Sequence, residues 1–128
     1  MITRFELPEA FDRDDRAHFE SGIAAFRSGD WYLAHDEWEE VWQGYRGADR
    51  RFLQGLIHVA VGAYHAECAN PKGACSQIGK AREKLTPYLP SHWGIDIAAL
   101  LLKATDVSSL MAGSDGAPDA ISERTRAI

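Results

Sequence analysis

Two stop–start signals divide the first two-thirds of this chain into helices that must fold back on one another. Apolar residues recur at helical spacing almost throughout, and no stretch shows the sustained alternation of a strand. Gly29 followed by Asp30 is typical of a left-handed helix end and a new N-cap. Asn70 followed by Pro71 again places an N-cap before a proline in the first turn. The sequence therefore predicts an all-α fold with short connections.

The punctuation and periodicity predict about five helices. Their ranges are 12–28, 31–43, 48–69, 71–85 and 95–104, the last with a short extension. We expect the first four to form two antiparallel helix hairpins, with the C-terminal helix packed against them in a compact bundle. The third helix is apolar on most of its surface and should be central. Residues 1–112 are predicted to form a single domain, and the tail 113–128, rich in Gly, Pro and alternating charge, is predicted to be disordered.

A weak internal repeat of about forty residues links the two hairpins. The first set of matched positions is Gly22, Ala34, Trp38 and Val41, and the second is Gly62, Ala74, Ile78 and Ala81. Glycine inside a helix costs about 1 kcal/mol relative to alanine, so Gly22 and Gly62 are predicted to mark close helix–helix approach. The pattern resembles the helix pairs of tetratricopeptide repeats. The alternative is that two similar hairpins share packing solutions by chance.

Charge and cysteine content limit the binding partners and the cellular compartment that we expect for this protein. A formal net charge of −5 without a Lys/Arg cluster argues against binding to nucleic acid or to an anionic membrane. The longest apolar run is too short to span a bilayer, and the N-terminal segment lacks an apolar signal core. Cys68 and Cys75 form no disulfide framework, which favours a reducing compartment. We therefore expect a cytoplasmic protein.

Polar side chains interrupt the buried faces of the second and third predicted helices. His35 and Glu39 are neighbours four residues apart, and Gln54, His58 and His65 project to one side of the next helix. A short turn makes these helices antiparallel, which would set His35 opposite His58 and Glu39 opposite Gln54. The tryptophans expected to wall this polar pocket are Trp31, Trp38 and Trp42.

Three kinds of role suit such a set of residues. Two histidines and a carboxylate can bind zinc or iron and leave open positions, so His35, Glu39 and His58 are candidate ligands of a metal-dependent hydrolase or oxygenase. A carboxylate beside an imidazole can also support acid–base catalysis. Alternatively, the network satisfies buried polar groups and fixes the pairing of two helices. No metalloprotease or paired-cysteine motif decides between these roles.

Two segments, AHDEWEEVW at 34–42 and FLQGLIHVAVGAYHAECANPKGA at 52–74, resemble the prokaryotic domain of unknown function family 309. The resemblance extends over roughly 19–102, and the matching positions are Gly29, Ala34, His35, Glu39, Trp42, Gln54, Gly55, Leu56, Ile57, His65, Asn70, Gly73 and Ala74. It implies a compact all-helical bundle in a cytosolic protein, and it implies no activity. The family usually has Glu at the position of Asp36 and often Gln at that of His58. A shared site would therefore rest on His35, Glu39, Gln54 and His65.

The leading functional interpretation is a cytosolic helical binding or interaction domain whose pocket lies between the second and third helices. The metal-dependent enzyme is the first alternative. The second is a peptide-binding scaffold like tetratricopeptide repeats, with a groove lined by the first and third helices. A protein partner or a homodimer is compatible with each. The aromatic pair His92 and Trp93 is expected to anchor its loop in the core.

Overall fold

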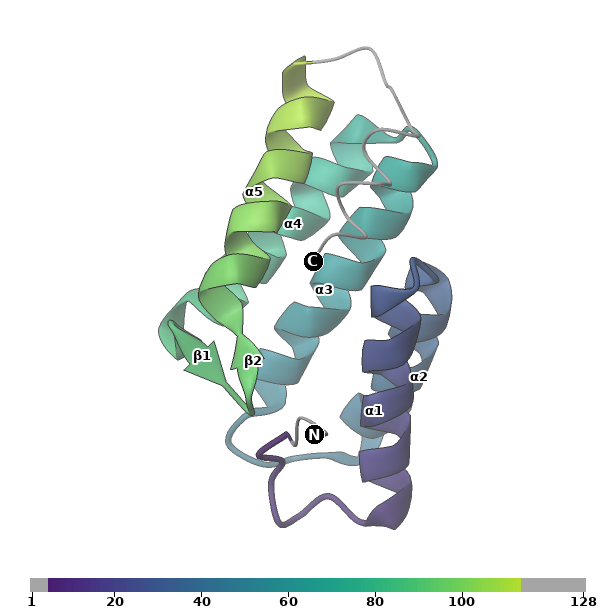
Figure 1. Cartoon of the computed structure of the whole chain (residues 1–128), viewed down its shortest axis with the longest axis vertical. Helices are drawn as coiled ribbons and strands as arrows, with labels where there is room; N and C mark the ends of the chain where they lie inside the picture. Colours follow the sequence, from purple (N-terminus) through teal and green to yellow (C-terminus); the bar gives the residue numbers. More distant parts are fainter. Residues whose placement is uncertain (1–4, 114–128) are drawn as a thin grey trace.

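The computed structural model describes residues 5–113, with side chains described for 5–106. Its helices are α1 (Arg13–Arg27), α2 (Trp31–Gly44), α3 (Arg50–Glu67), α4 (Pro71–Leu85) and α5 (Ile97–Gly113). Between α4 and α5 lie a short 3-10 turn, η1 (Thr86–Tyr88), and a two-stranded hairpin, β1 (Ser91–His92) with β2 (Ile95–Asp96). The predicted all-α fold is confirmed, and α3 lies between the α1–α2 pair and the α4–α5 pair (Figure 1).

The helix boundaries follow from local chemistry. Gly29 has a φ of 84°, in the left-handed region that glycine adopts without steric cost. The Asp30 carboxylate accepts a hydrogen bond from the Leu33 amide at 3.3 Å, and the Asn70 side-chain oxygen accepts one from the Gly73 amide at 3.1 Å. Both predicted N-caps are therefore confirmed. Residues 114–128, most of the segment predicted to be a disordered tail, lie outside the described part of the chain.

The forty-residue repeat recurs in space as a repeated contact. A Cβ atom built on Gly22 would lie 2.2 Å from Nε1 of Trp38, and one built on Gly62 would lie 2.6 Å from Cδ1 of Ile78. The two glycines are forty residues apart, and so are the two side chains that cover them. The prediction of close helix approach at both glycines is thus confirmed, and the two hairpins share one packing solution.

Trp93 joins the β1–β2 turn to the aromatic core. Its side chain is 4% exposed, and its ring centroid lies 4.8 Å from that of Phe52 and 5.5 Å from that of Phe19. The indole Nε1 donates a hydrogen bond to Oδ2 of Asp49, the residue before α3, at 3.0 Å. The loop aromatic therefore anchors in the core, as the sequence predicts for it. The small hairpin was not predicted, because strands of two residues each are too short to show alternation.

One further property bears on the class of protein. Within residues 5–113, no helix is both long enough and apolar enough to cross a lipid bilayer. This agrees with the short apolar runs of the sequence.

Candidate functional site

His35 and Glu39 are neighbours on α2, as their spacing predicts. Nε2 of His35 lies 3.6 Å from Oε2 of Glu39, and Nδ1 of the same ring donates to Oδ1 of Asp36 at 3.2 Å. The two side chains are 27% and 34% exposed, so they sit at the edge of the helix interface. The imidazole is therefore oriented by carboxylates on both of its nitrogens.

His58, which the sequence places in the same pocket, finds its hydrogen-bond partner on another helix. Its Nδ1 donates to Oε1 of Gln77 on α4 at 2.7 Å. Burial lowers the pKa of His58, and the Gln77 bond and the charge of Glu39 offset part of that effect. Glu39 thus lies within electrostatic range of His58, but the histidine holds α3 to α4. Gln54 is half-buried on α3.

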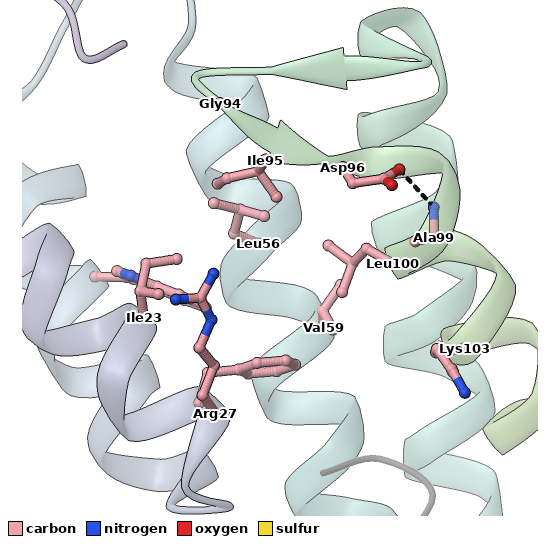
Figure 2. Close-up of a pocket in the computed structure, with 12 residues that line it drawn as sticks. Ile23, Arg27, Leu56, Val59, Gly94, Ile95, Asp96, Ala99, Leu100 and Lys103 are labelled. Carbon is pink, nitrogen blue, oxygen red and sulfur yellow. Dashed lines mark hydrogen bonds between the residues drawn. The ribbon is translucent and has the colours of Figure 1, made fainter. Parts of the chain in front are cut away.

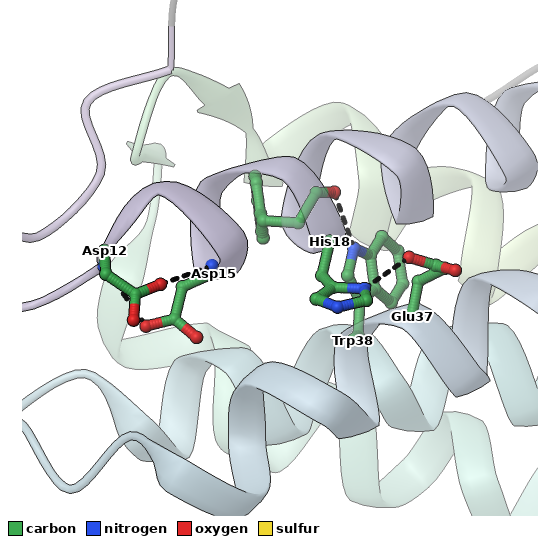
Figure 3. A network of polar contacts seen from close by, with 6 residues as sticks. Asp12, Asp15, His18, Glu37 and Trp38 are labelled. Atoms are coloured by element: carbon green, nitrogen blue, oxygen red, sulfur yellow. Dashed lines mark hydrogen bonds and ion pairs between the residues drawn. The ribbon is translucent and has the colours of Figure 1, made fainter.

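Two of the three tryptophans expected to wall the pocket, Trp38 and Trp42, lie in different surroundings. Trp38 is buried against Gly22, and its Nε1 donates to the backbone oxygen of Phe19 at 3.1 Å (Figure 3). Trp42 is half-buried near the end of α2, where the guanidinium of Arg50 lies 3.6 Å from the ring centroid. Trp38 therefore belongs to the core between α1 and α2, and Trp42 to the turn that leads into α3.

The three residues predicted as metal ligands are only partly brought together. His35 and Glu39 are adjacent, whereas Nδ1 of His58 is engaged by Gln77. In the described part of the chain, no group of three or more His, Cys, Asp or Glu side chains has an arrangement that could hold a metal ion.

His65 closes the turn between α3 and α4. The side-chain nitrogen of Asn70 donates to Nδ1 of His65 at 3.2 Å, while the Asn70 oxygen caps α4. A Cβ atom at Gly73 would lie 2.7 Å from the Asn70 nitrogen and 2.9 Å from Cγ of His65. The spacing of His65, Asn70 and Gly73 therefore has a structural explanation, and it leaves Nε2 of the histidine as a donor.

The structure places His35 and His65 in one cleft between the start of α2 and the end of α3. We call this the aromatic cleft, and its volume is about 270 Å³. It is lined by Trp31, Tyr32, His35, Val61, Tyr64 and His65. The antiparallel pairing of the second and third helices that the sequence predicts brings these two helix ends together.

Two tyrosines that the sequence analysis did not propose as site residues dominate this cleft. Tyr32 is 55% exposed and Tyr64 is 36% exposed, and their ring centroids lie 5.3 Å apart at an angle of 64°. The hydrogen bond with the Cys68 thiol raises the pKa of Tyr64. A signal for Tyr32 exists in the sequence: it follows Trp31 directly, and successive side chains of a helix point about 100° apart, so Tyr32 lies to one side of the face that Trp31 buries.

Carboxylates contact the residues that line the aromatic cleft. Nε1 of Trp31 donates to Oε2 of Glu67 at 3.3 Å, and Asp36 and Glu39 lie against His35. α2 carries four acidic residues and no Lys or Arg, and among the described residues no Lys or Arg lines the cleft. The cleft therefore combines exposed aromatic rings with negatively charged side chains next to them.

Two polar contacts are related by the same forty-residue spacing as the contacts at Gly22 and Gly62. Nδ1 of His18 donates to Oε2 of Glu37 at 2.8 Å (Figure 3), and Nδ1 of His58 donates to Oε1 of Gln77 at 2.7 Å. Each member of the first pair lies forty residues before its counterpart. The first histidine thus faces a carboxylate and the second a neutral amide. The hydrogen bond to Glu37 raises the pKa of His18, and burial lowers that of His58.

Exchanging the hydrogen-bond acceptors of His18 and His58 tests whether these acceptors help to set the pKa values of the two histidines. We expect Glu37→Gln to lower the pKa of His18 and Gln77→Glu to raise that of His58, each measured by NMR titration of the imidazole signals. In the wild type, the stabilising effect of charged His18 is present below pH 6.5 and lost as the pH rises through its raised pKa. The effect of neutral His58 is present above pH 6.5 and lost as the pH falls through its lowered pKa. Two histidines that titrate at the same pH in the wild type would contradict the assignment.

The comparisons with known proteins agree with the resemblance seen in the sequence. No curated protein matches the chain. The family model that matches is the domain of unknown function (DUF309), over residues 19–76. This segment contains α2, α3 and every residue that lines the aromatic cleft. Residues 19–76 thus match the DUF309 family model, and this match supports the family that the sequence resembles.

Proposed function

We propose that this protein is a binding module that recognises an arginine-bearing segment of a partner protein at the aromatic cleft. The observation that carries the proposal is the exposed corner formed by the Tyr32 and Tyr64 rings beside the acidic face of α2. The proposed role as an interaction domain is the one expected from the sequence. The proposed binding site, however, is centred on the start of α2 and the end of α3 instead of lying between His35 and His58.

The aromatic side chains support a protein partner. Tyr32 and Tyr64 keep large exposed areas although the cleft they line is mostly apolar, and Leu33, the residue after Tyr32, is 45% exposed. Tyrosine and tryptophan are enriched at protein–protein interfaces, where they bury much area with few rotatable bonds. A ring corner of this kind can hold the flat face of a guanidinium group.

The surrounding charge supports a basic segment. Asp36 is 57% exposed and Glu39 34% exposed, so both carboxylates remain open to a cation arriving at His35. Glu67 adds a carboxylate that accepts the hydrogen bond of Trp31, a residue of the cleft. An arginine can stack on a tyrosine ring and donate to one of these carboxylates at the same time.

Selection of displayed short random peptides on the immobilised protein tests the proposal. We expect the selected sequences to be rich in arginine, and the tightest synthetic peptide to lose at least about tenfold in affinity for the Tyr32→Ala/Tyr64→Ala variant. Asp36→Asn should weaken the same peptide to a smaller extent, more so at low ionic strength.

The matched control is Leu102→Ala, which removes a side chain that is 68% exposed on α5. It should leave the affinity unchanged, and circular dichroism should show that all variants fold. Selected peptides without an excess of basic residues, or with equal affinity for the double tyrosine variant, would overturn the proposal.

A further inference from the structure

A second pocket, of about 280 Å³, lies where α1, α3 and α5 meet, with β2 at one end (Figure 2). We call it the three-helix pocket. Its apolar walls include Ile23 and Phe26 of α1, Leu56 and Val59 of α3, and Leu100 of α5. α5 and β2 thus enclose this pocket more than a groove between α1 and α3 alone would be enclosed. That enclosure suits a small molecule better than an extended peptide.

Two cations stand at this pocket. Arg27 extends from α1 beside Ile23, and Lys103 stands on α5 across the pocket (Figure 2). Both residues are exposed, and neither side chain forms a hydrogen bond or an ion pair with any other described residue. Asp96 is the one acid in the described lining, and its carboxylate already accepts a hydrogen bond from the Ala99 amide at 2.9 Å as it caps α5.

The charge at this pocket is opposite in sign to that of the whole chain. The chain has a formal net charge of −5, whereas Arg27 and Lys103 outnumber Asp96 in the described lining. At the three-helix pocket two unpaired cations flank a surface of aliphatic and aromatic side chains. A ligand that offers an anion to the cations and an apolar body to the walls complements both features.

We propose that the three-helix pocket binds a small organic carboxylate with an apolar body. The carboxylate lies between Arg27 and Lys103, and the body packs against Leu56 and Val59. The pocket has about twice the volume of a cavity that holds benzene, so it accommodates a ligand of roughly ten non-hydrogen atoms. This site lies on different elements from the aromatic cleft, so the two proposals stand or fall separately.

Calorimetric titration with three eight-carbon probes tests the charge requirement. Octanoate carries the anion, 1-octanol is its neutral counterpart and octylammonium reverses the charge. We expect saturable binding of octanoate, weaker binding of octanol and the weakest of octylammonium. NMR shift changes caused by octanoate should centre on the amides of Leu56, Val59 and Leu100.

The variant Arg27→Gln/Lys103→Gln should lower octanoate affinity at least about tenfold while leaving octanol affinity unchanged. Arg13→Gln/Lys72→Gln makes the same change in net charge at two exposed positions away from the pocket and should have no effect. Equal binding of octanol and octanoate, shift changes outside the pocket, or an octanoate affinity that the first variant leaves intact would each overturn the proposal.

Discussion

Replacing Trp93 by alanine is expected to lower the free energy of unfolding by about 3–5 kcal/mol, the usual cost of removing a buried tryptophan. The indole packs edge-on against Phe11, Phe19 and Phe52, which come from three separate parts of the chain. It also supplies the hydrogen bond that ties the β1–β2 turn to Asp49 at the start of α3. The backbone of Trp93 has a φ of 55°, an unfavourable conformation that the buried ring must offset.

Urea unfolding followed by far-ultraviolet circular dichroism measures this loss without relying on tryptophan fluorescence. Trp42→Ala is the matched control, because Trp42 is half-buried and the guanidinium of Arg50 lies over its ring face. We expect Trp42→Ala to cost less than half as much as Trp93→Ala. Equal losses for the two variants would mean that Trp93 does not have the central role in the core assigned to it.

The second large loss of stability is expected when Gly22 is replaced by alanine. An alanine methyl there would lie 2.2 Å from Nε1 and 2.4 Å from Cδ1 of the Trp38 indole, which is rigid and buried. The ring must move, and that movement breaks its hydrogen bond to the Phe19 carbonyl oxygen. We expect Gly22→Ala to reduce the free energy of unfolding by about 3 kcal/mol, through overpacking and the loss of a buried hydrogen bond.

The repeat supplies graded controls for this prediction. A methyl group at Gly62 would meet the flexible end of Ile78, which can rotate away, so Gly62→Ala should cost less than Gly22→Ala. Gly79 lies on exposed surface within α4, and no neighbouring atom lies within 4 Å of a Cβ built there. Gly79→Ala should therefore stabilise the protein by about 1 kcal/mol through helix propensity alone. A loss at Gly79 as large as that at Gly22 would show that helix packing is not the cause.

The helices were predictable from the sequence because their boundaries depend on neighbouring residues. Gly29, Asp30 and Asn70 act within one turn of the chain, and apolar periodicity identifies the buried face of each helix. The adjacency of His35 and Glu39 was predictable for the same reason, since four residues make one turn of a helix.

The partner of His58 was harder to predict, because spacing along a helix does not say which neighbouring helix a side chain meets. His58 bonds to Gln77 of α4, although its charge interaction with Glu39 of α2 shows that α2 is also near. The forty-residue repeat could have identified the partner of His58. Extended from the apolar positions to the polar ones, it relates His18–Glu37 to His58–Gln77 and pairs each histidine with the next helix.

The two pockets depend on residues that no local pattern brings together. Tyr32 and Tyr64 meet only because α2 and α3 are antiparallel and their ends align. Arg27 and Lys103 lie far apart in the sequence and share a pocket only because the fold brings α1, α3 and α5 to the same place. Sites of this kind follow from the packing of helices rather than from motifs.

The most direct test of the proposed function is an NMR titration of the protein with N-acetyl-arginine amide. If the aromatic cleft binds arginine side chains, the amide signals of Tyr32, His35, Tyr64 and His65 will shift saturably, and N-acetyl-glutamate amide will leave them in place. Shifts that spread evenly over acidic surface such as Asp14 and Glu40, or that never saturate, would contradict it.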